Sequence, residues 1–399
     1  MNSVNDKSEA YDSLYDQLKS DAMPLVEELF RSNDGFTNDP SDEILKLKKT
    51  FGKKPLRFLQ VLQKYYMMAT MGQNEYPVAH TSQFMLMAWL LWFRRRKTLS
   101  VIDSYKNLYL KKIARFEKML PQIDFSDNHK HMIKVMMANT LAVFINQPVF
   151  KKKKHHVELH KAFLKGFYVG ITYVVADLSL DAGILPDDLK PAFHQRTLDA
   201  LSGRPVAPHE NNLLHFIHVI QQESAKDLPF SENEYIYKVL YLLEKAQYEE
   251  RHLDVDLSKQ ESIIEKTVLL GLKTHFTLMS IRFNSEEEFQ KGMNDGVLWS
   301  LYCQLTDDIR DFHQDKREGL TTLFTGFEQG QTAFNPYSFY LHLTHHFSKH
   351  YHAKWLYKDF IEYLRRNENP ELKALDDEKA AIFIKRLTGI DLEEFEKAH

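Results

Sequence analysis

The sequence contains little of several residue types that define whole classes of protein. Its 399 residues include a single cysteine, Cys303, which excludes a disulfide framework and a zinc site built from several cysteines. We therefore expect a reducing compartment, namely the cytoplasm. The formal net charge is only -3, whereas domains that bind nucleic acid are strongly basic. Nucleic acid is not an expected partner.

The most apolar run of the sequence is too short to span a bilayer. The most apolar stretch, FMLMAWLLWF at 84–93, is half the roughly 20 residues that a spanning helix needs. We interpret it as a buried helix that ends in the basic residues RRRK, and docking on a membrane surface stays open as the alternative. Residues 1–20 are polar and lack the apolar core of a secretory signal, so export is not expected.

Glycine and proline are scarce, with 14 and 13 residues, and they cluster at a few breaks. The clearest breaks are GILPDDLKP at 183–191, LSGRPVAPHE at 201–210 and GFEQGQTAFNPYS at 326–338. Between such breaks, as in 161–178 and 234–250, apolar residues recur every three or four positions, which is the period of a helix with one buried face. No alternating strand pattern occurs. The sequence therefore predicts an all-α fold.

One weak boundary divides this helical chain. The stretch LPQIDFSDNHK at 120–130 contains proline and several polar residues between helical patterns. We therefore expect an N-terminal helical region at 1–125, to which the sequence assigns no role, and a helical bundle at 126–399.

The segment QLTDDIRDFHQDKREGLTTL, residues 304–323, concentrates acidic side chains on a predicted helix. Asp307, Asp311 and Asp315 are spaced four apart and share one face, with Asp308 beside its start. Like charges at this spacing repel, so the pattern favours a bound cation. Magnesium binds one or two protein carboxylates and completes its shell with water and phosphate oxygens. The alternative is a solvated acidic face, balanced by three basic residues of the segment: Arg310, Lys316 and Arg317.

A second acidic pair ends an apolar helix. Asp177 and Asp181 in YVVADLSLDAG are again four residues apart, so their carboxylates leave the same face where the helix meets a loop. Carboxylates in an apolar setting are costly unless they bind a partner. Two such helices facing one another would hold a metal cluster at the mouth of an apolar cavity.

Two histidine patterns give weaker indications of metal. His342, His346 and His350 share one helix face, but no further ligand is evident, and a histidine-rich surface helix is the alternative. Glu249 and His252 form one ExxH pair, whereas a di-iron bundle needs two such pairs and two more glutamates.

The order of these motifs resembles the class I isoprenoid enzymes: trans-prenyl diphosphate synthases, squalene and phytoene synthases, and class I terpene cyclases. DDIRD at 307–311 is similar to the second DDxxD motif of the prenyl diphosphate synthases, and Gln304 stands where their FQxxDD glutamine does. DKREGLTTL at 315–323 is similar to the run that follows that motif. The Lys-Thr pair at 266–267 precedes it at a similar distance. The resemblance extends over about residues 160–323.

The sequence departs from the family pattern at three places. The first motif, DLSLD, keeps the outer Asp177 and Asp181 but has Leu178 at its second position, which is the DxxxD form of squalene-type enzymes. Leu320 replaces the family's lysine after the second motif. A Gly-Lys-x-x-Arg element that holds isopentenyl diphosphate is absent ahead of the first motif. GKKPLR at 52–57 lies more than a hundred residues upstream.

The resemblance implies a class I isoprenoid synthase bundle with an N-terminal helical extension, and an enzyme that ionises an allylic isoprenoid diphosphate. It implies Mg²⁺, or Mn²⁺, as the cofactor. The implied metal ligands are four carboxylates: Asp177, Asp181, Asp307 and Asp311. Asp308 is counted with them as a catalytic carboxylate.

The resemblance also implies how the substrate is bound. Positive side chains would hold the diphosphate, with Lys273 as the alternative to Lys266. Aromatic rings on the first-motif helix, such as Phe167, Tyr168 and Tyr173, would shield the carbocation. Tyr173, or its neighbour Thr172, stands where the synthases have the residue that limits chain length. The substrate-binding residues expected are Lys266, Lys273, Gln304, Arg310, Asp315, Arg317 and Tyr173.

Three functions remain open at this point. The leading hypothesis is a prenyltransferase that joins an allylic diphosphate to a second isoprenoid, supported by the DDIRD motif, Gln304 and Lys266. A class I terpene synthase that cyclises its substrate, formally a lyase, is favoured by the missing isopentenyl diphosphate element. A non-catalytic isoprenoid-binding subunit is the third. A peripheral membrane contact and a homodimer also stay open.

Overall fold

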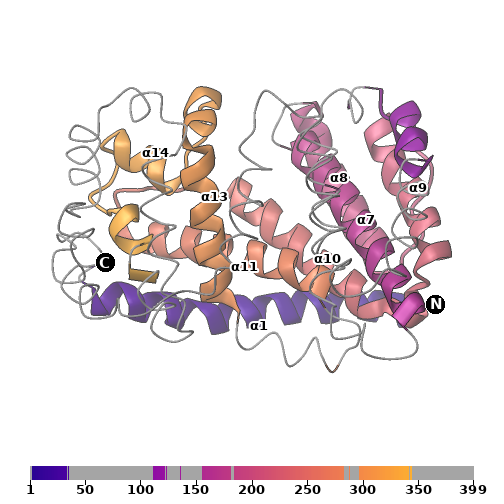
Figure 1. Ribbon diagram of the computed structural model, residues 1–399, viewed down its shortest axis with the longest axis horizontal. Helices are drawn as coiled ribbons and strands as arrows, with labels where there is room; N and C mark the ends of the chain where they lie inside the picture. Colours follow the sequence, from indigo (N-terminus) through magenta and orange to yellow (C-terminus); the bar gives the residue numbers. More distant parts are fainter. Residues whose placement is uncertain are drawn as a thin grey trace, which may run out of the picture. The chain divides into compact units, whose positions relative to one another are not determined.

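The structure is a computed structural model that describes residues 2–33, 35, 111–121, 123, 135, 155–180, 184–282, 287, 296–340 and 342–343 (Figure 1). Helices make up 81% of the described part of the chain, and no strand occurs there, so the all-α prediction is confirmed. The expected boundary between residues 125 and 126 lies outside the described residues, as do residues 52–57 and 84–93.

The chain divides into two compact units. Unit 1 combines residues 1–15, 61–248 and 276–295, and unit 2 combines residues 16–60, 249–275 and 296–399. Helices α1 (Asn2–Ser32), α10 (Phe230–His252) and α11 (Gln260–Arg282) contribute residues to both units.

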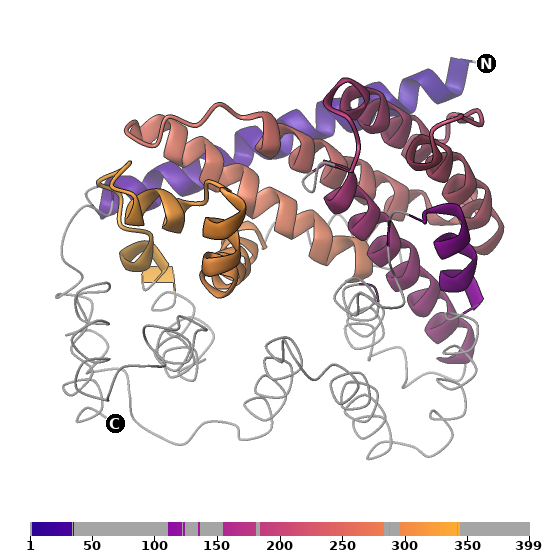
Figure 2. The same ribbon diagram turned by 90° about the horizontal axis from the view of Figure 1, so that it is seen from above.

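Unit 1 is built around α7 (His155–Leu180), which continues the apolar pattern noted in the sequence. Every residue from 162 to 171 is buried, Lys165 included, so this part of α7 is enclosed on all sides. Helix α9 (Asn212–Asp227) packs against α7 and against α8 (Lys190–Leu201), and these helices lie side by side in Figures 1 and 2.

By length and composition, residues 160–180 of α7 form the one helix within the described ranges that could cross a membrane. Of its most apolar window, 78% is buried inside the protein, and the core helix of a soluble protein meets the same criterion.

The breaks predicted in unit 1 are confirmed. Pro186 precedes the 3-10 helix η3 (Asp187–Leu189), and a proline opens the first turn of α8, where no amide donor is needed. Gly203 follows α8 with φ of 85°, a left-handed conformation that glycine adopts without strain. Asn211 then caps α9, because its side-chain oxygen accepts hydrogen bonds from two amides of the first turn.

A polar cluster ties residues 111–119, which are helical, to the core of unit 1. The Lys112 ammonium lies 2.6 Å from a carboxylate oxygen of Asp227 on α9, and the hydroxyl of Tyr168 on α7 donates to the same oxygen. Burial, together with this carboxylate, raises the pKa of Tyr168 far above its usual value, so the phenol stays protonated.

Unit 2 contains α13 (Val297–Glu318) and α14 (Leu323–Glu328), which lie side by side in Figure 1. Gly319, at φ of 72°, ends α13 by donating its amide to the carbonyl of Asp315. Thr322 caps α14 through a capping box with Thr325. Gly319 and Thr322 belong to the DKREGLTTL stretch, so the turn after the acidic helix is specified by the local sequence.

Candidate functional site

Helix α13 carries residues 304–318 of the acidic segment without a break, and the helix predicted for 304–323 ends at Gly319. Successive residues of an α-helix are rotated by about 100°, so Gln304, Asp308, Asp311 and Asp315 fall within about 60° of one another, with Asp307 at one edge. Within this set, Asp308 is buried, whereas the side chains of Asp307 and Asp315 are half-buried. The predicted shared face is therefore present in the helical backbone.

Gln304 forms hydrogen bonds at both ends of its amide, and one of them connects α13 to α11. Its Nε2 donates to Oδ1 of Asp308 at 2.7 Å, and its Oε1 accepts from the hydroxyl of Thr274 at 2.7 Å. Because each amide atom has a partner of the right kind, the orientation of the Gln304 side chain is fixed.

Asp308 is 8% exposed, and this burial raises the pKa of its carboxyl to about 6. The hydrogen bond from Gln304 and the positive charges of Lys273 and Lys266 oppose that rise. The rise prevails because desolvation penalises the charged form more than these groups stabilise it. The residue therefore changes charge close to neutral pH.

Two lysines of α11 share one carboxylate from α10. Oε1 of Glu250 lies 3.1 Å from Nζ of Lys266, and Oε2 lies 3.4 Å from Nζ of Lys273. Lys266 and Lys273 are seven residues apart, so they lie on the same face of α11, two turns from each other. Burial alone would raise the pKa of Glu250, but the two lysines hold it at about 2. The carboxylate is ionised at neutral pH.

Small residues allow α11 and α13 to approach. A Cβ atom at Gly271 would lie 3.1 Å from a methyl group of Val297, and one at Gly296 would lie 2.4 Å from the ring of His275. The second distance is shorter than any tolerated contact, so Gly296 is required where α13 begins. Ser300, one turn later, lies 3.4 Å from Nδ1 of His275. This close packing fixes the acidic helix against the lysine helix.

The first acidic motif belongs to unit 1. Asp177 is half-buried in the last turn of α7, and Asp181 lies outside the described residues. Tyr173 precedes Asp177 by one turn and is also half-buried. The structure thus describes one carboxylate of this motif and leaves the expected pair untested.

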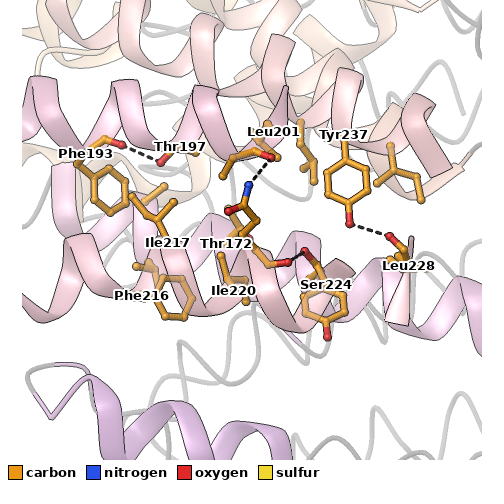
Figure 3. A pocket seen from close by; sticks show the side chains of 17 residues that line it. Thr172, Phe193, Thr197, Leu201, Phe216, Ile217, Ile220, Ser224, Leu228 and Tyr237 are labelled. Atoms are coloured by element: carbon orange, nitrogen blue, oxygen red, sulfur yellow. Dashed lines mark hydrogen bonds between the residues drawn. The ribbon is translucent and has the colours of Figure 1, made fainter. Parts of the chain in front are cut away.

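An apolar cavity of about 50 Å³ lies in unit 1, between α7, α8, α9 and α10 (Figure 3). Thr172 lines it, whereas Tyr173 does not. Around α7, Tyr173 lies roughly 110° and Asp177 roughly 150° from the centre of the lining face, which holds Thr172 and three further residues: Tyr168, Val175 and Ala176. The cavity therefore lies on a different side of α7 from the first acidic motif.

Several polar side chains around this cavity form hydrogen bonds within the protein. The hydroxyl of Thr197 donates to the carbonyl of Phe193, and that of Tyr237 donates to the carbonyl of Leu228, as Figure 3 shows. A cavity that holds benzene has about 150 Å³, so 50 Å³ is too small for a prenyl chain in this conformation. We interpret it as a packing void.

The structure describes some of the remaining predicted residues and not others. Arg317 is exposed near the end of α13, whereas the side chains of Arg310 and Asp311 lie outside the described part. His342 is half-buried, but His346 and His350 are not described, so the histidine face is untested. Among described residues, no three histidine, cysteine or acidic side chains converge as a metal site.

Two residues of the site were missed by sequence reasoning. Glu250 and Thr274 each connect a predicted residue to a neighbouring helix. The sequence provides only part of the information needed to find them. Thr274 adjoins the predicted Lys273, but Glu250 is one of several glutamates in α10, and nothing in the sequence distinguishes it from the others. Its neighbour Glu249, the ExxH glutamate, pairs instead with Lys19 in unit 2. Only the fold separates the roles of these adjacent glutamates.

Comparisons with protein-family models, with curated proteins and with solved structures give no match to this chain. The functional assignment therefore depends on the residues described above and on the motif resemblance.

Proposed function

We propose that this protein is a magnesium-dependent enzyme that ionises an allylic prenyl diphosphate and joins it to a second isoprenoid. The observation that carries the proposal is the cluster in unit 2. Lys266, Lys273 and Gln304, which the resemblance singles out, belong to one connected group with Asp308 and Glu250. Motif spacing alone does not require such a connection.

This cluster suits the departure of a diphosphate. Ionisation develops negative charge on the leaving group, and cations held in a partly buried site stabilise that charge strongly. The side chain of Lys273 is 22% exposed, whereas that of Lys266 is 8% exposed. Gln304 holds the acidic helix beside these lysines through Thr274. The protein thus brings positive charge and carboxylates to one region.

The donor set of the acidic motifs fits magnesium. Carboxylate oxygens are hard ligands, and Mg²⁺ binds few of them when a substrate phosphate completes its shell. In the proposal Asp307 and Asp311 of α13, with Asp177 and Asp181 of the first motif, would hold the metal. Bound magnesium, or manganese, would act as a Lewis acid that neutralises charge on the leaving diphosphate.

The proposal is tested by incubating the purified protein with geranyl, farnesyl and geranylgeranyl diphosphates, each with and without isopentenyl diphosphate. We expect longer prenyl diphosphates that form only with isopentenyl diphosphate and Mg²⁺, and no product after chelation by EDTA. Hydrocarbons or alcohols formed from one substrate alone would instead identify a terpene cyclase. Binding of these diphosphates without turnover would identify a non-catalytic isoprenoid-binding protein.

A further inference from the structure

The two lysines of the unit 2 cluster differ in their surroundings. Lys266 has 8% of its side chain exposed and is closer to Glu250, at 3.1 Å, whereas Lys273 has 22% exposed and is 3.4 Å away. An ammonium group buried as deeply as that of Lys266 needs a permanent counter-ion. Glu250 provides it with one oxygen and keeps the other oxygen for Lys273.

Lys273 also lies on the side of the cluster that leads to the acidic helix. Its neighbour Thr274 donates to Gln304, which in turn donates to Asp308. Lys273 is therefore the more accessible lysine of the pair, and it adjoins the contact between α11 and the acidic helix.

We infer that Glu250 is a positioning residue that orients Lys273 toward an inorganic or substrate diphosphate, while Lys266 serves as its buried anchor. The inference rests on the proposed function and deepens it, because it assigns different roles to the two lysines. Glu250 acts through Lys273 and does not contact the diphosphate. Its two carboxylate oxygens form ion pairs with the ammonium groups of Lys266 and Lys273, which would otherwise repel each other.

The experiment measures binding of inorganic pyrophosphate to the intact chain by isothermal titration calorimetry, in the presence of Mg²⁺. We expect Glu250→Gln to weaken binding at least tenfold, because the amide cannot hold both ammonium groups. Glu250→Asp keeps the charge and restores part of the affinity. The matched control is Glu249→Gln, the adjacent glutamate, which pairs with Lys19 and leaves the dissociation constant within twofold of wild type.

A double-mutant cycle separates positioning from a general loss of structure. In a Lys273→Gln background, which is already weakened, Glu250→Gln should change the dissociation constant less than twofold. A full tenfold loss in that background overturns the inference, because Glu250 then acts without Lys273. Tighter binding by Glu250→Gln also overturns it, since Glu250 would then compete with the ligand. Circular dichroism of each variant confirms the fold, and Glu250→Asp is used if Glu250→Gln does not fold.

This measurement is independent of isoprenoid turnover. Pyrophosphate binding that depends on Glu250 and Lys273 supports the inference even if no prenyl diphosphate reacts. If the protein turns over prenyl diphosphates but Glu250→Gln does not change its affinity for pyrophosphate, the proposed function is supported and the inference is overturned. A folded wild-type protein that binds no pyrophosphate overturns it as well.

Discussion

Gln304 and Asp308 lie one turn apart on α13 and share a 2.7 Å hydrogen bond, in which the amide Nε2 donates to the carboxylate Oδ1. Asp308 is the second aspartate of the DDIRD motif, and it is the buried one, whereas Asp307 is half-buried. Adjacent aspartates thus have different environments on the same helix. Asp308 is suited to holding the helix in place, and Asp307 to binding a ligand.

From the burial of Asp308 we predict how the free energy of unfolding depends on pH. Its pKa is about 6 in the folded protein and about 4 in an unfolded chain, so its contribution to the free energy of unfolding falls as pH rises from 4 to 6. Asp308→Asn keeps an oxygen that accepts from Gln304 but does not titrate. We expect the variant to gain about 2 to 3 kcal/mol relative to wild type between pH 4 and pH 7.

Urea unfolding at pH 4.5, 5.5 and 7 measures this difference. A difference that stays constant over this range would show that Asp308 titrates normally. If Asp308→Asn is more stable than wild type but has lost turnover, the Asp308 carboxylate lowers the stability of the fold and is required for activity.

Glu250 predicts the opposite pH dependence. The folded pKa is about 2 and the unfolded value is about 4.3, so the stabilising contribution is complete above pH 4.3 and declines as pH falls toward 2. Glu250→Gln should therefore be less stable than wild type at pH 7, by about 3 kcal/mol, and the gap should narrow between pH 4.3 and 2. Glu249→Gln, whose carboxylate is 36% exposed, should lose less than about 1 kcal/mol.

Chemical denaturation of the three proteins from pH 2.5 to 7 tests this prediction. Equal losses in the two variants would contradict the distinct environments of these adjacent glutamates.

Two glycines of unit 2 should respond differently to alanine. At Gly319 a Cβ atom meets nothing within 4 Å, so Gly319→Ala carries only the strain of a positive φ, about 1 kcal/mol. At Gly296 the Cβ atom would overlap the buried ring of His275, so Gly296→Ala must shift that ring or one of the two helices. We expect a larger loss of thermal stability for Gly296→Ala, and loss of turnover with it. Differential scanning calorimetry ranks the two, and a milder effect at Gly296 would argue against the close approach.

The cavity of unit 1 predicts that one alanine can be enlarged without cost. Ala200 lines the cavity, so Ala200→Val should fill empty space and stabilise the protein by about 1 kcal/mol or leave it unchanged. Ala162, which is 1% exposed and does not line the cavity, is the matched control. Ala162→Val should overpack α7 and cost about 1 to 3 kcal/mol. Similar losses at both positions, measured by thermal unfolding, would show that the cavity is filled or collapses in solution.

The all-α class was predictable because helical period and helix-breaking residues are local properties. Pro186 and Gly203 end or separate helices where the sequence indicates a break. Gly319, by contrast, ends α13 inside a segment that the sequence predicts to be helical. The shared face of α13 was predictable for the same reason, since the spacing of its aspartates determines their direction around the helix.

The partners of that face were not predictable. Glu250 lies 16 and 23 residues before the lysines that it joins, and no spacing rule connects residues of different helices. The orientation of α7 was equally hidden. Thr172 and Tyr173 are adjacent in sequence, yet only Thr172 lines the cavity, because the neighbouring helices decide which side of α7 faces an incompletely packed region.

The most direct test of the proposed function is the release of inorganic pyrophosphate from an allylic prenyl diphosphate, measured in a single turnover with excess protein and Mg²⁺. Asp307 is the aspartate to replace, because it is half-buried at the edge of the acidic face, whereas Asp308 is buried. We expect rapid release by wild type and by Glu328→Gln, an exposed control on α14, and release slowed by about 100-fold or more in a folded Asp307→Asn variant. Release at the wild-type rate by Asp307→Asn would contradict the proposed function.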